Sequence, residues 1–248
     1  MLLQSIFFYD SDRNFLTLNV RVQAESEPKT TYQVANYSPN WPQNGEIEFK
    51  NYYAKYRQNL PFVLKNVSFK INGGEKIGVV GRTGSGKSTT LLSLLRIIEA
   101  NSGHIYIDGV DISKLGLDDL RRKITIIPQD PLLYKGTLRT NLDLLGQYKD
   151  ADIWKALEKT HMGHKFKRFG LSSEVKEGGE NFSAGEKQLL CIARAILNKN
   201  KVILVDEATS SIDNVTEETI IESIHENFKD CTMITIAHRL KTIIGSDK

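Results

Sequence analysis

The chain has 248 residues, of which 40% are hydrophobic and 25% charged, so it is long enough and apolar enough to bury a large globular core. Its 33 basic and 30 acidic residues give a net charge of +3, a balance that argues against nucleic acid as the main partner. No stretch approaches about 18 consecutive apolar residues, so we expect no membrane-spanning helix within this sequence. Cys191 and Cys231 lie in apolar runs without metal-type spacing, which is typical of buried, reduced thiols.

The N-terminal part differs from the rest in composition. Residues 21–45 are polar, are interrupted by prolines and end at a glycine, which indicates a linker or an extended arm. We therefore expect residues 1–44 to form an N-terminal arm and linker, and residues 45–248 to form one folded domain.

The remaining chain alternates strand-like and helix-like segments. Apolar and polar positions alternate over residues 46–58 and 61–71, as in half-buried antiparallel strands. Further strands are expected at 75–80, 103–112 (a strand or hairpin), 122–131, 201–206 and 231–237, and helices at 89–100, 147–169, 184–197, 216–228 and 239–244. Strands that alternate with helices after residue 75 indicate an α/β fold with a mainly parallel core, beside which the antiparallel strands form a side sheet.

A glycine-rich loop follows the strand expected at 75–80. Its sequence, GRTGSGKST, matches the pattern Gly-x4-Gly-Lys-Ser between a strand and a helix. Glycines let the backbone turn successive N–H groups toward a phosphate, the lysine reaches the β- and γ-phosphates, and the serine hydroxyl ligates Mg²⁺. The expected nucleotide-binding residues of this P-loop are Gly81, Thr83, Gly84, Ser85, Gly86, Lys87, Ser88 and Thr89, with Ser88 as the metal ligand.

A second motif ends the continuous apolar strand KVILVD. It delivers Asp206 and Glu207 at the carboxyl end of the strand, where ligands bind in open α/β sheets. Asp206 would hold Mg²⁺ through water, and Glu207 would orient or deprotonate the attacking water. The alternative is that two carboxylates merely finish a strand in solvent.

A third motif, ENFSAGEKQLL, is a Ser–Gly turn that opens a helix. Free N–H groups at such a helix start suit an anion. The same pattern, Ser183-x-x-Glu186, is also a capping box, in which the two residues satisfy the first N–H groups of their own helix.

Six segments, taken in order, resemble the nucleotide-binding domains of ATP-binding cassette (ABC) transporters. They are GRTGSGKST, IPQDP, NFSAGEKQ, VILVDEAT, SSID and IAHRL, and the likeness covers roughly residues 45–245. Details such as EGGENFS most resemble subfamily C, the multidrug-resistance-associated group, and within it the second nucleotide-binding domain, since first domains there often carry Asp where this chain has Glu207. The resemblance implies a P-loop NTPase core with a mainly parallel sheet, an antiparallel β subdomain and an α-helical subdomain that carries the signature NFSAGEKQ.

The resemblance also implies two further residues of the catalytic site. Gln129 would touch the Mg²⁺ or the attacking water and signal to membrane-domain helices, whereas the alternative is an ordinary turn residue between two prolines. His238 would contact the γ-phosphate, and the alternative there is a structural histidine at a strand end.

Tyr56 would stack on adenine, with Tyr52 and Tyr53 as nearby alternatives. Asp213 would lie at a subunit contact, or else would only cap a helix.

In this family two nucleotide-binding domains face each other head to tail. The resemblance therefore implies that Ser183 and Gly185 act on the ATP held by a second nucleotide-binding domain, and that this chain carries two half-sites. The signature departs from the usual Leu-Ser-Gly-Gly-Gln: Ala184 replaces a glycine, and Glu186 replaces the glutamine. Because Glu186 places negative charge near a γ-phosphate, we expect it to weaken this contact relative to glutamine.

The motifs and the resemblance thus predict an ABC-type ATPase domain over residues 45–248, truncated at its C-terminal end since it stops ten residues after His238. It would bind MgATP, dimerise and hydrolyse ATP to drive export of a solute, at the cytoplasmic face of a membrane, held there by transmembrane domains outside this chain. A soluble ABC ATPase and a regulatory module that binds ATP but hydrolyses it poorly are the alternatives.

Overall fold

The computed structural model describes residues 37–208, 212–237, 243 and 245–248, without the side chains of Asn214 and Val215. The chain divides into two compact units. The first unit comprises Met1–Thr125, Asn200–Asp206 and Asp230–Lys248, and the second unit comprises Ile126–Lys199 and Glu207–Lys229.

The first unit contains an antiparallel sheet whose strand order is β2-β1-β4-β5. Its strands are β1 (Ile47–Ala54), β2 (Leu64–Ile71), β4 (Ser102–Ile107) and β5 (Val110–Asp111). Phe49 pairs with Phe69 across β1 and β2, and the two rings stack with their centroids 4.5 Å apart. The burial of β1 alternates along the strand but changes phase near Asn51, whose φ is 45° and where the pairing register shifts, as at a β-bulge. The predicted antiparallel side sheet is confirmed, and residues 103–112 form a hairpin.

A second sheet has the strand order β3-β10-β9-β6. Its strands are β3 (Lys76–Val79), β10 (Thr232–Ile236), β9 (Val202–Asp206) and β6 (Ile124–Ile127), at which the chain passes from the first unit into the second. Strand β10 is parallel to both β3 and β9, and all five of its residues are buried, as in a parallel strand covered on both faces. The other edge of β3 receives hydrogen bonds from the C-terminal residues, since Gly78 N donates to Lys248 O and Asp247 N donates to Lys76 O.

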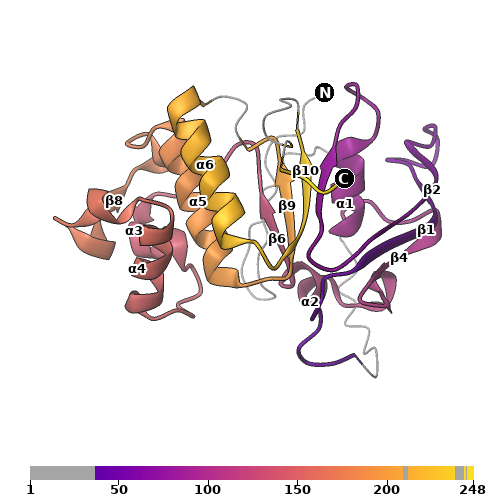
Figure 1. Ribbon diagram of the computed structural model, residues 1–248, viewed down its shortest axis with the longest axis horizontal. Helices are drawn as coiled ribbons and strands as arrows, with labels where there is room; N and C mark the ends of the chain where they lie inside the picture. Colours follow the sequence, from indigo (N-terminus) through magenta and orange to yellow (C-terminus); the bar gives the residue numbers. More distant parts are fainter. Residues whose placement is uncertain (1–36, 209–211, 238–242, 244) are drawn as a thin grey trace. The chain divides into compact units, whose positions relative to one another are not determined.

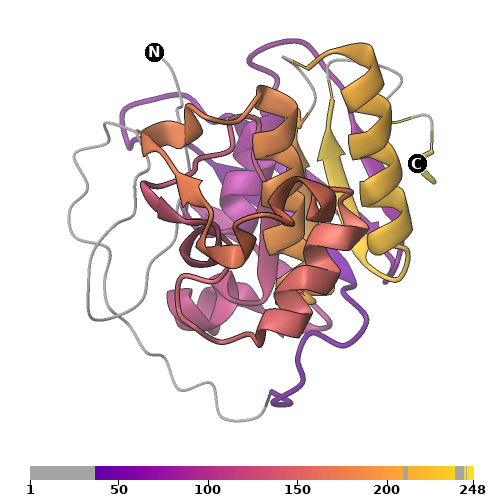
Figure 2. The same ribbon diagram turned by 90° about the vertical axis from the view of Figure 1, so that its left-hand side faces the viewer.

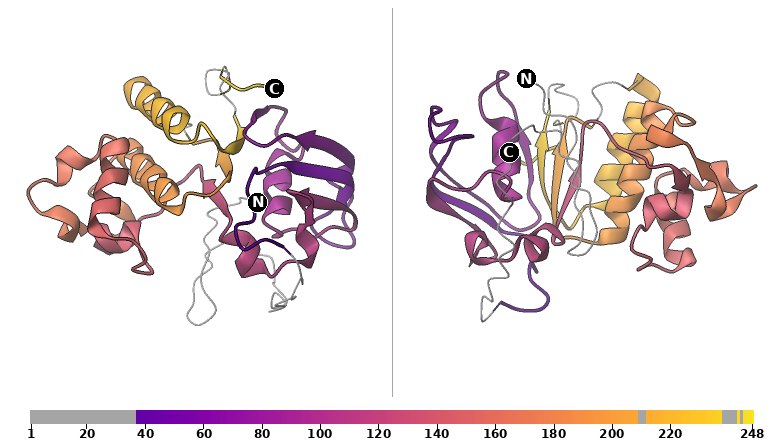
Figure 3. Two further views of the ribbon diagram at one scale, coloured as in Figure 1. Left: turned by 60° about the horizontal axis from the view of Figure 1, so that its bottom comes forward. Right: turned by 180° about the vertical axis from the view of Figure 1, so that it is seen from behind.

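Helix α1 (Lys87–Leu94) lies between the two sheets of the first unit (Figures 1 and 3). The first unit also contains η1 (Ile112–Lys114) and α2 (Leu117–Arg121). The helix expected over 89–100 ends earlier than predicted, because Arg96 adopts a left-handed backbone with φ of 49°. Its guanidinium donates to the carbonyls of Ile112 and Leu115, so contacts distant in sequence end the helix.

The second unit is mainly helical. Its elements are β7 (Gly136–Thr137), α3 (Leu138–Leu142), α4 (Asp150–Lys159), η2 (Gly163–Phe166), η3 (Gly170–Ser172), β8 (Glu174–Val175), η4 (Glu177–Gly179), α5 (Ala184–Asn198) and α6 (Asn214–Asn227). Helix α5 packs against α4 and α6 (Figures 1 and 2). The single helix predicted over 147–169 is wrong in extent: α4 ends at Lys159, and His161 has a φ of 58°, which breaks the helix before η2.

Residues just before β1 pack on the antiparallel sheet. Trp41 is 3% exposed, and its indole N–H donates to the carbonyl of Ile107 over 2.8 Å. The carboxylate of Asp108 accepts the backbone N–H groups of Gln43, Asn44 and Glu46 over 2.6, 2.9 and 2.8 Å. The end of the expected linker is therefore held against the fold, and the boundary at residue 45 stays a prediction.

Both cysteines are free thiols; Cys191 is buried, which raises the pKa of its thiol, and Cys231 is half-buried. Among the described residues, no helix is both long and apolar enough to cross a bilayer. Most of the helix expected at 239–244 lies outside the described residues.

Candidate functional site

The P-loop of the first unit has a shape that requires its glycines. Gly84 and Gly86 have φ values of 84° and 95°, which side-chain-bearing residues rarely adopt. A Cβ added to Gly81 would lie 2.7 Å from Ser85 Oγ, and one added to Gly86 would lie 3.0 Å from Leu64 Cδ2. A side chain at these positions would therefore strain the backbone or crowd its neighbours, which explains why the loop uses glycine there.

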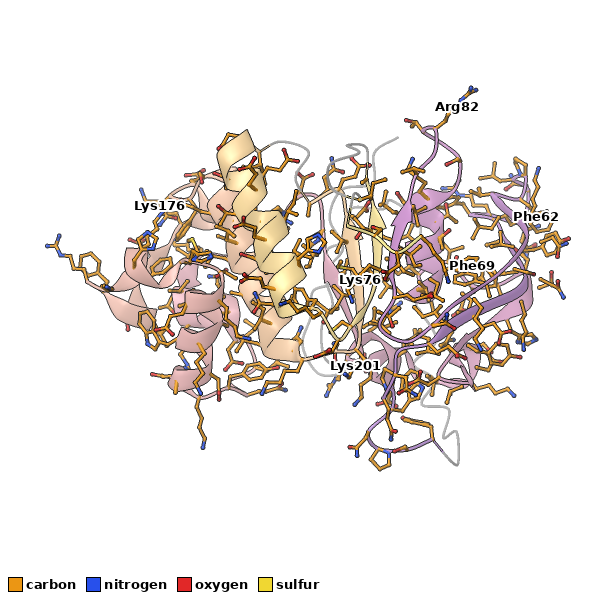
Figure 4. All side chains as sticks on the ribbon, in the orientation of Figure 1. Phe62, Phe69, Lys76, Arg82, Lys176 and Lys201 are labelled. Carbon is orange, nitrogen blue, oxygen red and sulfur yellow. The ribbon has the colours of Figure 1, made fainter. Side chains whose placement is uncertain are left out.

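Lys87 directs its charge into this loop. The side chain is buried, and its ammonium donates to the carbonyls of Gly81 over 2.8 Å and Arg82 over 3.3 Å, neither of which carries a formal charge. In the part of the chain that the structure describes, no side chain caps the start of α1, where Gly86 is the N-cap residue. A buried cation beside an uncapped helix start fits a polyphosphate. Figure 4 shows the side chain of Arg82 pointing outward at the tip of the loop.

Tyr56 is attached to the same helix. Its hydroxyl lies 3.1 Å from the hydroxyl of Thr89, which is 3% exposed on α1. Of the two alternatives, Tyr52 is 2% exposed and donates its hydroxyl to Ile98 O over 3.4 Å, while Tyr53 packs edge-on against Phe62. Tyr56 is thus the one whose hydroxyl lies beside Thr89, in the first turn of α1, and its role as the adenine-stacking residue stays a prediction.

Asp206 ends β9 at the edge of the sheet from which the P-loop leaves. In the parallel register Asp206 pairs with Ile236, and Ile236 pairs with Val79, which lies two residues before Gly81. Ser88 lies in the first turn of α1. A carboxylate and a hydroxyl are oxygen ligands of the kind that Mg²⁺ prefers, so the residues present fit this ion. His238, two residues beyond Ile236, lies outside the described residues.

The second unit carries the other predicted catalytic residues. Glu207 follows Asp206 directly and has a φ of 47°, an unusual backbone for a residue with a side chain. Gln129 is exposed and lies two residues after β6. The carbonyl before it, that of Pro128, accepts a 3.1 Å hydrogen bond from Nε2 of Gln188, a fully buried residue of α5.

Helix α5 begins with a complete capping box. Ser183 Oγ accepts the N–H of Glu186 over 3.2 Å, and Glu186 Oε2 accepts the N–H of Ser183 over 2.9 Å. The capping interpretation of Ser183-x-x-Glu186 is confirmed. Lys165 adds an ion pair to Glu186 Oε1, so the carboxylate has a cation beside it that the sequence analysis did not identify.

Gly185 is enclosed by the start of α6. A Cβ added to it would lie 2.2 Å from Thr216 Cγ2. The N–H of Thr216 in turn donates to Oδ1 of Asp213, the N-cap residue of α6, over 3.0 Å. Asp213 thus caps a helix, and its expected place at a subunit contact stays a prediction.

The predicted site residues therefore fall into two groups. The first unit brings together the P-loop, Tyr56 and Asp206, whereas the second unit carries Gln129, Glu207 and the signature. Sequence reasoning missed Lys165, Gln188 and Thr216. Lys165 lies 21 residues from its partner Glu186, and Thr216 lies far along the chain from Gly185, so local patterns carry no signal for them.

Residues 64–210 match the family model described as ABC transporter, a span that begins at β2 and includes the P-loop, the signature and Glu207. This match covers more than half of the 248 residues. The chain therefore belongs to the ABC transporter family, whose shared domain binds ATP.

Within the family the chain is similar to subfamily C proteins. It is 46% identical over 244 residues to ATP-binding cassette sub-family C member 3 of Rattus norvegicus, covering 96% of this chain and 16% of that protein. It is 51% identical over 211 residues to sub-family C member 2 of the same species, covering 84% of this chain and 14% of that protein. It is 53% identical over 210 residues to ABC transporter C family member 2 of Dictyostelium discoideum, covering 84% of this chain and 15% of that protein. The chain thus spans only a small part of the length of these relatives, and its assignment to a second nucleotide-binding domain stays a prediction.

Proposed function

We propose that the chain is the MgATP-binding and ATP-hydrolysing domain of a subfamily C exporter. The observation that carries this proposal is the P-loop of the first unit, where, among the described residues, the buried Lys87 ammonium donates to two backbone carbonyls beside a helix start that no side chain caps. The same unit places Asp206 at the sheet edge from which this loop leaves. The family match supports the same function.

The residues of the first unit would bind the substrate as follows. Lys87 would pair with the β- and γ-phosphates, the loop amides would surround them, and Tyr56 would stack on the adenine. Ser88 and Asp206, with Gln129, would hold the Mg²⁺, which neutralises charge that develops on the phosphate oxygens. In this bound state the γ-phosphate would be held in one orientation, in which water can attack it in line with the bond to ADP.

Glu207 would accept the proton of that water as its oxygen attacks the γ-phosphorus and the bond to ADP breaks. Gln129 would orient the water, and His238 would contact the γ-phosphate. The Ser183 and Gly185 half-site would face the ATP of a second nucleotide-binding domain in a head-to-tail dimer. Through transmembrane domains, at the cytoplasmic face of a membrane, hydrolysis would drive solute export.

Two variants test this function. Lys87→Ala should abolish tight ATP binding in titration calorimetry, because it removes the cation paired with the phosphates, whereas Lys155→Ala, which removes an exposed lysine of α4, should bind normally. Glu207→Gln should retain MgATP binding but lose about 10²–10⁴-fold in the rate of phosphate release, the usual cost of losing a general base. The matched control is Glu180→Gln, which alters an exposed carboxylate.

Three results would contradict the proposal in different ways. Unchanged affinity in Lys87→Ala would exclude the P-loop as the ATP site. Wild-type hydrolysis in Glu207→Gln would place the catalytic base elsewhere, and ATP binding without phosphate release in the wild type would indicate a regulatory module. The transport role is tested by expressing the whole gene locus and asking whether the reading frame continues into transmembrane segments. A reading frame without such segments would indicate a soluble ABC ATPase.

A further inference from the structure

A lysine distant in sequence is held against the start of the signature helix. Lys165, in η2 (Gly163–Phe166), forms an ion pair with Glu186 Oε1, and its ammonium lies 4.8 Å from the centroid of the Phe182 ring. The two charged side chains are 33% and 30% exposed, so the pair lies at the surface but is partly shielded from water. Lys165 therefore contacts residues on both sides of Ser183.

Both carboxylate oxygens of Glu186 are engaged. Oε1 binds Lys165, and Oε2 accepts the N–H of Ser183, while the Ser183 hydroxyl accepts the N–H of Glu186. Burial raises the pKa of Glu186, but the hydrogen bonds from Lys165 and from the Ser183 amide outweigh it, so that the net pKa is lowered. The carboxylate is ionised at neutral pH, and its charge is balanced by one specific cation.

This balance matters for any phosphate that approaches the helix start. The N-terminus of α5 favours an anion, but an unpaired carboxylate in its first turn would repel one. An ion pair of Lys165 and Glu186 has no net charge, as a neutral glutamine at position 186 would have none. The expected weakening by Glu186 thus applies to a lone carboxylate and not to the pair that the structure shows.

We propose that Lys165 is a positioning residue of the signature half-site, which holds Glu186 in the capping box and cancels its charge so that Ser183 and Gly185 can face the partner domain's ATP. This inference rests on the proposed function, because the ATP concerned is that of a second nucleotide-binding domain. It makes Lys165 and Glu186 one functional unit, in which the lysine matters only while the carboxylate is present.

A double-mutant cycle tests this dependence. On the Glu207→Gln background, sedimentation with and without MgATP measures dimerisation of the wild-type signature and of Lys165→Met, Lys165→Arg, Glu186→Gln and Lys165→Met/Glu186→Gln. Methionine retains an apolar chain over Phe182 but removes the charge. Lys167→Met, at the exposed end of η2, is the matched control.

We expect Lys165→Met to weaken ATP-dependent dimerisation by about three- to fivefold, since it leaves the charge of Glu186 unbalanced. Lys165→Arg and Lys167→Met should dimerise as the background does. The double variant should return to within about twofold of the background, because the carboxylate that needed the lysine is gone. Background-like dimerisation of Lys165→Met, or a double variant as weak as Lys165→Met, would overturn the inference.

A failure of the proposed function gives a different pattern. If the Glu207→Gln background with its wild-type signature stays monomeric with MgATP, the dimer proposal is wrong, and Lys165 is then tested in the monomer. Hydrogen exchange at the Ser183 amide should become faster in Lys165→Met and remain unchanged in Lys165→Arg and Lys167→Met. Equal exchange rates in Lys165→Met and the wild type would overturn the positioning role itself.

Discussion

Replacing Gly185 by alanine should disturb the contact between α5 and α6. The added Cβ would lie 2.2 Å from Thr216 Cγ2 and 3.2 Å from Thr216 Cβ, whereas the next contact, Ile212 Cγ2 at 3.6 Å, is ordinary. The first distance is far below the roughly 3.5–4.0 Å of a favourable carbon–carbon contact. Thr216 cannot yield freely, because its N–H is held by Asp213 at the N-cap of α6.

The expected magnitude follows from two opposing effects. Overpacking of this kind costs about 1–3 kcal/mol, and alanine in place of glycine in a helix returns up to about 1 kcal/mol. We expect Gly185→Ala to lower the free energy of unfolding by about 1–2 kcal/mol, which lowers Tm by roughly 2–8 °C for a chain of this size. Thr216→Ser removes the clashing Cγ2, so Gly185→Ala/Thr216→Ser should recover most of the Tm.

Two measurements separate the packing role of Gly185 from a role at a partner's nucleotide. Calorimetry gives the Tm of the two single variants and the double variant, and sedimentation on the Glu207→Gln background gives their dimerisation. If Gly185 also allows close approach of a partner's nucleotide, the double variant regains stability but dimerises poorly with MgATP. An unchanged or raised Tm in Gly185→Ala would refute the packing argument. Full dimerisation of the stabilised double variant would refute the role of Gly185 at the nucleotide.

Two further predictions concern the first unit. Tyr56→Ala should weaken ATP binding by about 1–3 kcal/mol in titration calorimetry, because the stacking ring is lost. Tyr56→Phe loses only the hydroxyl contact with Thr89 and should weaken binding much less. Equal losses in the two variants would indicate that the hydroxyl, and not the ring, contributes to ATP binding. Trp41→Phe should lower the free energy of unfolding by about 1–3 kcal/mol in thermal denaturation, because the Ile107 carbonyl loses its indole donor. An unchanged stability would show that this hydrogen bond does not stabilise the fold.

The strands and the P-loop could be predicted because their signals are local. Period-two alternation marks β1, a continuous apolar run marks β9, and Gly84 and Gly86 of the P-loop occur where the backbone has a positive φ. The capping box at Ser183 is likewise predictable, because its two residues lie only three positions apart in the sequence.

Helix ends and charge partners could not be predicted, because they depend on contacts between distant residues. Helix α1 ends where Arg96 turns toward carbonyls 16 and 19 residues further on, and α4 ends before His161, a left-handed residue that is neither glycine nor proline. Nothing near Glu186 in the sequence identifies Lys165 as its partner. The effect of having Glu186 in the signature can therefore be judged only once the structure shows its ion pair with Lys165.

Helix α5 binds the segment that follows β6 through two of its side chains. Gln188 donates to the carbonyl of Pro128, and Arg194, six residues further along, donates to the carbonyls of Leu132 over 2.8 Å and Asn141 over 2.5 Å. The segment that begins at Pro128, next to Gln129, is thus hydrogen-bonded to α5 both at its start and further along, at Leu132 and Asn141. Since Ser183 at the capped end of α5 lies only about 8 Å along the axis from Gln188, we expect a displacement of the segment beside Gln129 to be felt at the signature.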